Sequence, residues 1–274
     1  MNVKIFIPPP SLQDVIVNIS TVDVVLPQGI RDVSTPYPPT PFQSLIFYCG
    51  HQISMNRLGE TFGKQPVTVL LGPQFSRVNI MVHERLFAIK VDFLPGALHR
   101  LTGISMHEYL DQGMDAALVF GKELITVEKQ LLELNYIEEG IPIVSNFLIH
   151  LLKKQKEILP FDEALLEMVR FNGGLKIETT ASLACLSLKQ FERKCRERIG
   201  MSPKMYSRIL RFSKAYRLHE ANPETSWTSI AHEAGYFDQM HLIRDFREFA
   251  GVNPRIIQKE LLQTPFRMQK DLGW

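Results

Sequence analysis

The chain has 274 residues, of which 45% are hydrophobic and 22% charged, and its formal net charge is +2. This composition is typical of a folded protein with room for two domains, and it argues against disorder throughout. No 18-residue apolar run occurs and no basic-then-apolar segment follows Met1, so we expect no membrane span, no secretion and a cytoplasmic location. Three cysteines are too few and too scattered for a disulfide framework.

The first 112 residues are expected to form a β-rich, barrel-like domain. Residues 1–44 are rich in proline, which disfavours a long helix and favours extended or turn conformations. Short runs of β-branched and aromatic residues then predict strands over residues 45–49, 67–71, 77–83 and 86–93. A short helix is predicted over residues 97–101, and Ser105 with Glu108 predicts the capped start of another.

Five aromatic residues in this part are candidates for lining a pocket in the barrel: Phe47, Tyr48, Phe75, Phe87 and Phe93. Such residues also commonly fill a core. A ligand pocket and a solid core therefore both stay open from the sequence.

Residues 113–157 change to a helical period, which predicts two helices divided by the segment at residues 140–142. These helices could pair two chains or pack on their own barrel. The third segment, residues 158–274, is predicted to be all-α. Its first helix is expected over residues 162–171, after Pro160 and before Asn172-Gly173-Gly174.

The C-terminal segment repeats one pattern. Two positions recur at an offset of 50 residues, namely Ala181 with Ala231 and Cys185 with Gly235. Four recur at an offset of 51, namely Arg193 with Arg244, Arg196 with Arg247, Gly200 with Gly251 and Pro203 with Pro254. One residue has therefore been gained in the second turn.

Each repeat has the pattern of a helix-turn-helix unit. A small residue allows two helices to approach, and the turn residue four positions later favours positive φ, which suits Gly235 but not Cys185. Helices with one apolar face are predicted over residues 187–199 and 238–249. Their apolar residues are Phe191, Cys195 and Ile199 in the first and Leu242, Phe246 and Phe249 in the second.

One amphipathic helix is predicted between the units, over residues 202–221, with Ser202 as N-cap and Pro203 just inside the start. Such a helix is about 30 Å long. That length is close to the spacing of about 34–36 Å between successive major-groove faces of B-DNA.

Positive charge is concentrated in the same region. Between Ser187 and Arg217 there are ten basic and two acidic residues, a local net charge of +8. The basic residues are Lys189, Arg193, Lys194, Arg196, Arg198, Lys204, Arg208, Arg211, Lys214 and Arg217. This distribution indicates a phosphate-bearing partner.

Taken together, the last hundred residues resemble the DNA-binding domain of the AraC/XylS family of bacterial transcription regulators. The resemblance lies in Leu186-Ser187, Phe191-Glu192-Arg193, Gly200-Met201-Ser202-Pro203, Ile230-Ala231, Ala234-Gly235-Tyr236, Asp238, Leu242, Arg244, Phe246 and residues 251–254. The first unit departs from the family pattern at Cys185, where glycine is usual, and at Cys195, where phenylalanine is usual.

The resemblance implies a sequence-specific transcription factor that binds double-stranded DNA and reads two adjacent major-groove segments per chain. The residues expected to face the bases are Lys189, Gln190, Arg193, Gln239, Met240 and Arg244. Those expected to contact phosphates are Arg196, Lys204 and Arg247. Whether the protein activates or represses transcription stays open.

The first domain resembles the sensor-type, cupin-like domains that precede AraC-type modules, on the stretch from Leu86 to Gly103. The overall prediction is an α+β chain, with a β-rich barrel-like domain and following helices, then two helix-turn-helix units joined by a long helix. The resemblance also raises a small-molecule effector, a homodimer and a contact with RNA polymerase as partners.

Two other classes of protein were weighed. A DNA alkyl-repair enzyme fused to an AraC-type module would need several cysteines at its zinc site, but the N-terminal half contains only Cys49. A pure interaction protein would not be expected to keep Arg193, Arg196 and Arg244. Because the histidines share no ligand spacing, no metal is expected. No Walker loop, Rossmann fingerprint or nucleophile elbow occurs, so neither a cofactor nor a catalytic residue is expected.

Overall fold

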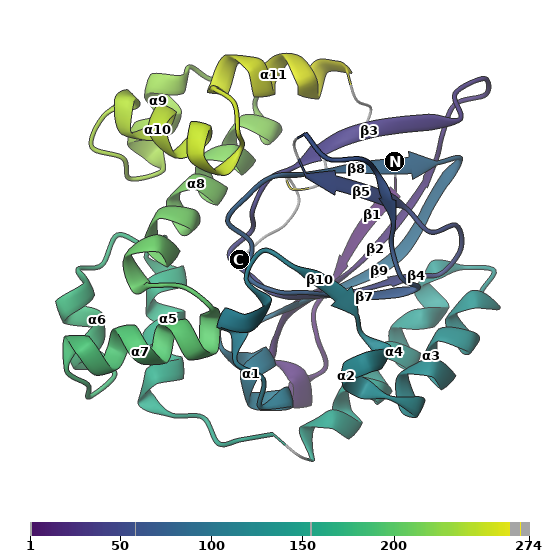
Figure 1. Ribbon diagram of the computed structural model, residues 1–274, viewed down its shortest axis with the longest axis horizontal. Coiled ribbons are helices and arrows are strands. Elements are labelled where there is room, and N and C mark those ends of the chain that lie inside the picture. The colour runs from purple at the N-terminus through teal and green to yellow at the C-terminus, as the bar shows by residue number, and fades with distance from the viewer. Residues whose placement is uncertain (1, 58, 154, 264–268, 270–274) are drawn as a thin grey trace.

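The computed structural model describes residues 2–57, 59–153, 155–263 and 269, and it places a β-rich part beside a helical part (Figure 1). The strands are β1 (Asn2–Phe6), β2 (Ile16–Val25), β3 (Asp32–Tyr37), β4 (Ser44–Tyr48), β5 (Ser54–Arg57), β6 (Gly63–Lys64), β7 (Thr68–Leu71), β8 (Val78–His83), β9 (Arg85–Phe93) and β10 (Gly113–Asp115). The four strands predicted from the sequence are confirmed as β4, β7, β8 and β9, to within one residue at each end.

The helices fall into two groups. The N-terminal group consists of η1 (Pro10–Leu12), α1 (Ala97–Thr102), η2 (Met106–Tyr109), α2 (Ala117–Phe120), α3 (Lys122–Leu132), η3 (Ile137–Glu139) and α4 (Gly140–Leu152). The C-terminal group consists of α5 (Pro160–Arg170), α6 (Ile177–Leu183), α7 (Leu188–Ile199), α8 (Pro203–Ala221), α9 (Trp227–Glu233), α10 (Gln239–Phe249) and α11 (Pro254–Gln263). The predicted α+β class, β-rich first and all-α last, is confirmed.

Two sheets form the N-terminal part. A six-stranded sheet has the order β1-β2-β9-β4-β7-β10, and a four-stranded sheet has the order β3-β8-β5-β6. Strand β9 lies inside the larger sheet, between β2 and β4, and is buried on both faces. Its side chains alternate, so that Leu86 and Ala88 belong to the apolar cluster between the sheets, whereas Phe87 and Ile89 belong to the cluster under the helices.

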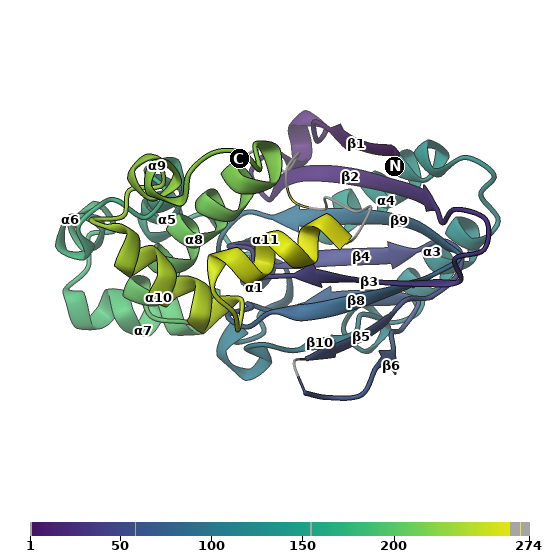
Figure 2. The ribbon, with the colours of Figure 1, turned by 90° about the horizontal axis from the view of Figure 1, so that it is seen from above.

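The outer face of the six-stranded sheet is covered by helices α1, α3 and α4 (Figures 1 and 2). Val127 of α3 and Val144 of α4 share one buried cluster with Phe47 and Ile89 of the sheet. The contact is close at Gly140, where an added Cβ would lie 2.4 Å from Cδ1 of Ile89. Of the two roles weighed for these helices, packing on their own sheet is therefore observed.

Three strands lie in the proline-rich start, where no strand was predicted individually. Strand β3 includes Pro36, which lacks a backbone N–H and is tolerated because β3 is an edge strand paired only with β8. The prediction of a capped helix at Ser105 was wrong, because η2 is a short 3₁₀ turn and the Ser105 side chain makes no capping bond. Pro160 is not a break before the next helix but its first residue, so α5 begins two residues earlier than predicted.

Most of the five aromatic residues that were candidates for lining a barrel pocket do not line it. Tyr48 faces the cavity between the sheets. Phe47, Phe87 and Phe93 lie on the opposite face and pack under the helices, and Phe75 is partly exposed. Neighbouring residues on a strand point to opposite faces of the sheet. Which of two neighbours faces the cavity therefore depends on which side of the strand is turned toward it.

Two of the contacts between the halves of the molecule lie at the end of α7 and on α11. At the end of α7, an added Cβ on Gly200 would lie 2.5 Å from Cγ of Pro73 and 2.8 Å from the carbonyl oxygen of Met106. On the other side, Nη1 of Arg77 lies 2.6 Å from Oε2 of Glu260 on α11. Each helix-turn-helix unit is thus held against the β-rich part by its own contact.

Candidate nucleic-acid interface

The two repeats fold into the same unit. In the first, helices α6 and α7 are joined by a turn in which the Leu186 N–H donates to the Ala181 carbonyl at 3.0 Å. In the second, α9 and α10 are joined by a turn in which the Tyr236 N–H donates to the Ala231 carbonyl at 2.9 Å. The predicted pair of helix-turn-helix units is confirmed in both elements and turns.

The turn residue of each unit has a left-handed backbone. The φ angle is 82° at Gly235 and 55° at Cys185. A residue with a side chain is strained in this region by about 1 kcal/mol relative to glycine. Cys185 therefore makes the first turn intrinsically less stable than the second, as its sequence position predicted.

Side-chain caps set the start of both second helices. The Ser187 hydroxyl accepts from the Gln190 N–H at 3.3 Å, and the Gln190 side-chain oxygen accepts from the Ser187 N–H at 3.0 Å, which forms a capping box. At α10, the Asp238 carboxylate accepts from the His241 N–H at 2.8 Å. The predicted helices over residues 187–199 and 238–249 are therefore confirmed, with their first residues as N-caps.

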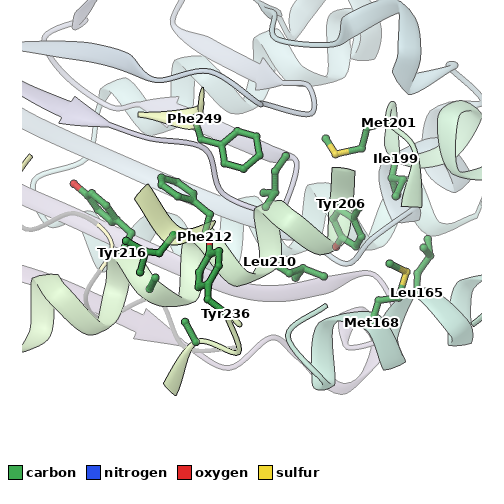
Figure 3. Close-up of a cluster of buried hydrophobic side chains, with 14 of the residues drawn as sticks. Leu165, Met168, Ile199, Met201, Tyr206, Leu210, Phe212, Tyr216, Tyr236 and Phe249 are labelled. Carbon is green, nitrogen blue, oxygen red and sulfur yellow. The ribbon is translucent and has the colours of Figure 1, made fainter. Parts of the chain in front are cut away.

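Helix α8 joins the cores of the two units. The predicted core residues Phe191, Cys195, Ile199, Leu242, Phe246 and Phe249 are all at most 1% exposed. In Figure 3, Tyr206 of α8 lies beside Ile199 of the first unit, and Phe212 lies toward Phe249 of the second. The ring centroids of Phe212 and Phe249 are 5.3 Å apart. Because α8 contributes to both cores, this helix of 19 residues, about 28 Å long, links the two units.

Helices α7 and α10 lie on the same side of α8, which is visible when Figures 1 and 2 are compared. The nine predicted DNA-contacting residues are all exposed: Lys189, Gln190, Arg193, Arg196, Lys204, Gln239, Met240, Arg244 and Arg247. Eight lie within α7 or α10 on either side of these helices' buried stripes, since their core residues are turned toward α8. The two second helices thus present polar surface from one side of the domain.

Two of these residues already use their side-chain oxygens. That of Gln190 belongs to the capping box, and that of Gln239 accepts from the Thr228 hydroxyl at 3.1 Å. Each keeps its amide NH₂ group as a donor. In the described part of the chain, the guanidinium groups of Arg193 and Arg244 make no hydrogen bond or ion pair.

The interpretation of the ten basic residues as one phosphate-facing set was partly wrong. Arg198 is buried in an ion pair with Asp162, and Nη2 of Arg208 lies 2.7 Å from Oδ1 of Asp245. Arg211 donates to the Gly173 carbonyl at 2.8 Å. Burial lowers the pKa of Arg217 to about 10. Arg198, Arg208 and Arg211 thus contact partners on other helices or turns of the domain, which sequence spacing does not reveal.

Little in the structure favours the chemistry of an alkyl-repair enzyme. Burial raises the pKa of the Cys49 thiol to about 12, so it stays protonated near neutral pH. Across the described ranges, no three His, Cys, Asp or Glu side chains come together as metal ligands. None of the helices described is both long and apolar enough to cross a bilayer.

Comparisons with known proteins agree with this geometry. Residues 180–260 match a family model described as a helix-turn-helix domain, and residues 4–115 match one described as a domain of unknown function, DUF6597. The comparison with curated proteins found no match.

Solved structures also resemble the chain. ToxT from Vibrio cholerae has 11% sequence identity and a TM-score of 0.49, over 88% of this chain and 98% of that one. The DNA-binding domain of AdpA, solved with a target DNA, has 21% identity and a TM-score of 0.37, over 40% of this chain and 100% of that one. The AraC-like activator CuxR has 10% identity and a TM-score of 0.28, over 95% and 85% of the two chains. None of these three TM-scores reaches 0.5, so the assignment rests on the matched domain and the geometry above.

Two helix-turn-helix units on one rigid helix, with exposed cationic second helices, define a DNA-binding domain. The arrangement and the matched residues are those of the AraC type. The protein is therefore a DNA-binding transcription regulator whose C-terminal domain is of the AraC type.

Proposed function

We propose that α7 and α10 enter adjacent major-groove segments and read an asymmetric element with two subsites about 10 base pairs apart. The observation that carries this proposal is the pair of capped helices on one side of α8, a helix of 19 residues that is about 28 Å long. The base-facing set is Lys189, Gln190, Arg193, Gln239, Met240 and Arg244. Arg196, Lys204 and Arg247 contact phosphates.

The test is binding to a duplex selected from a random pool by the full chain. We expect Arg193→Ala and Arg244→Ala each to weaken binding by about 1–3 kcal/mol and to relax the sequence preference at one position. Arg196→Ala and Arg247→Ala should instead weaken binding to all duplexes alike. Each should also reduce the slope of log K against log salt concentration by about one, because one phosphate contact is lost. Arg170→Ala is the control, because Arg170 is exposed on α5 and ion-paired with Glu167. Unchanged binding by both base-reading variants would contradict the proposal.

The segment at residues 113–157 is proposed to pair two chains, although it also packs on its own sheet. Five large apolar side chains there are exposed: Leu118 by 83%, Tyr136 by 70%, Leu132 by 49%, Ile125 by 41% and Ile149 by 36%. Ile125 and Leu132 are seven residues apart on α3 and so share one face. We expect wild-type protein to sediment as a dimer and Leu132→Glu as a monomer. A wild-type monomer at micromolar concentration would contradict the pairing.

A cavity of about 80 Å³ lies between the two sheets, and we propose that it binds a small effector. Its walls are mostly apolar and include Val22, Ile46, Tyr48, Val69 and Ile80. Lys90 lines it too, with Nζ 2.5 Å from Oδ1 of Asp92. Burial lowers the pKa of Lys90, but Asp92 and Tyr37 beside it more than offset this, so the pKa is raised and the ammonium forms a salt bridge with Asp92 that has no net charge.

A neutral pair in an apolar cavity favours an apolar effector with an uncharged polar group over a carboxylate. The test is thermal unfolding of the full chain with medium-chain alcohols and with the matching carboxylates. At 100 times its dissociation constant a ligand should stabilise the protein by about 2.7 kcal/mol. Ala88→Leu, which narrows the cavity, should remove the effect, because Ala88 lines it and is buried. Equal stabilisation of Ala88→Leu would place the ligand elsewhere.

The division into a sensor-type domain at residues 1–112, a pairing segment at 113–157 and a DNA-binding domain at 158–274 belongs to the same proposal. The family matches at residues 4–115 and 180–260 support its outer two parts. A cytoplasmic location and a contact with RNA polymerase stay predictions from the resemblance.

A further inference from the structure

The extra residue of the second repeat can be located. Leu186 and Tyr236, 50 residues apart, make the same backbone hydrogen bond in their turns. Ser187 and Asp238, 51 residues apart, are the N-caps of α7 and α10. In the first unit Leu186 is followed directly by the N-cap Ser187, whereas in the second Phe237 stands between Tyr236 and the N-cap Asp238. Phe237 is therefore the inserted residue.

The Phe237 side chain points away from the protein. It is 93% exposed, although its neighbour Tyr236 is only 8% exposed and packs in the core. Its ring meets the His241 ring edge-on, with the two centroids 6.2 Å apart. His241 is itself held at the helix start, with Nδ1 3.2 Å from Oδ1 of Asp238. The phenyl ring is thus held at the first turn of α10 while its surface stays open.

The location indicates DNA as the occupant. The leading residues of the second helix in such a unit meet base edges in the major groove. Met240, three residues after Phe237, is 58% exposed, and Arg244 lies one turn further along the same helix. The corresponding residue to Met240 in the first unit is the cationic Lys189, at an offset of 51. The first unit exposes one apolar residue at the start of α7, Leu188 at 45%, but it has no counterpart of the inserted Phe237.

An apolar side chain finds one complementary group on base edges in the major groove, the 5-methyl group of thymine. We propose that Phe237, together with Met240 three residues later, contacts a thymine methyl group in the subsite read by the second unit. This contact rests on the proposed function of α10. It predicts a preferred thymine in the second subsite that has no counterpart in the first.

The experiment replaces each thymine of the second subsite, one at a time, with deoxyuridine, which lacks only the methyl group. At one position we expect wild-type binding to weaken about fourfold, which corresponds to one buried methyl group at about 0.8 kcal/mol. Phe237→Ala should bind the thymine and deoxyuridine duplexes equally at that position, and Phe237→Leu should keep part of the difference. Phe171→Ala is the matched control, since Phe171 is 55% exposed at the end of α5, and it should behave as wild type.

The outcomes separate this contact from the function on which it rests. If wild type binds no selected duplex, or Arg244→Ala binds as wild type does, the proposed function of α10 fails. If Arg244→Ala weakens binding but no deoxyuridine position distinguishes wild type from Phe237→Ala, only the thymine contact is overturned. The thymine contact is also overturned if Phe237→Ala binds both the thymine and the deoxyuridine duplex more weakly than wild type by the same factor. The ring would then contact the sugar-phosphate backbone. Thermal unfolding of Phe237→Ala should match wild type, since the ring is 93% exposed.

Discussion

Replacing Gly173 with alanine is expected to destabilise the C-terminal domain by about 2–4 kcal/mol. Gly173 follows α5 with φ 71°, where a side chain is strained by about 1 kcal/mol. The added Cβ would also lie 2.3 Å from the carbonyl oxygen and 2.7 Å from Cα of Ser207, on the backbone of α8. A backbone clash cannot be relieved by a rotamer change, and overpacking of this kind costs about 1–3 kcal/mol.

Chemical denaturation of the full chain measures this loss, and Gly29→Ala is the control. Gly29 also has a positive φ, 90°, but an added Cβ there would meet no atom within 4 Å. It should therefore show the backbone strain alone, about 1 kcal/mol. If the two substitutions were equally destabilising, close packing of α8 on the end of α5 would not be the cause. DNA binding by Gly173→Ala should fall as well, because α8 sets the spacing of the two units.

Arg198→Ala is expected to destabilise the protein by about 3–5 kcal/mol, because it leaves a buried carboxylate without its cation. Nη1 of Arg198 lies 3.0 Å and 3.1 Å from the two oxygens of Asp162. The Asp162 side chain is only 5% exposed, and Oδ2 also accepts from the Leu159 N–H at 2.9 Å. The carboxylate is therefore held in place and cannot turn to solvent.

The equilibrium free energy of unfolding tests this, with a double variant as the decisive comparison. Asp162→Asn combined with Arg198→Met removes both charges and should be less destabilising than Arg198→Ala alone. The exposed pair of Arg170 and Glu167 is the surface control, and Arg170→Ala should change stability by less than about 1 kcal/mol. A loss of that small size for Arg198→Ala would show that Asp162 finds solvent or another partner.

The elements of the DNA-binding domain were predictable because their signals are local. Ser187, Asp238 and the apolar spacing that begins at Phe191 and Leu242 fix α7 and α10 within a few residues of chain. The structural role of Arg198 was not predictable, since its partner Asp162 lies 36 residues away. The same holds for Arg208, whose partner Asp245 is 37 residues away. Charge counted along the sequence cannot separate such residues from those that stay free for DNA.

The N-terminal half shows a different limit. The phase of β4 decides whether Phe47 or Tyr48 faces the cavity, and it depends on which face of the sheet the helices cover. That information lies in α3 and α4, which come some 80 residues later in the chain. The nine candidate DNA contacts are exposed as expected, but the bonds of Gln190 and Gln239 appear only once side chains are placed.

The contacts of Gly200 and Glu260 with the β-rich half connect the two ends of the molecule energetically. If either contact must break on DNA, the free energy of breaking it reduces the apparent affinity, tenfold for about every 1.4 kcal/mol. An effector that binds in the cavity and weakens the same contact would restore the apparent affinity for DNA. Reciprocity then requires the duplex to change the affinity of the effector by the same ratio, so a measurement of either binding reaction reports on the other.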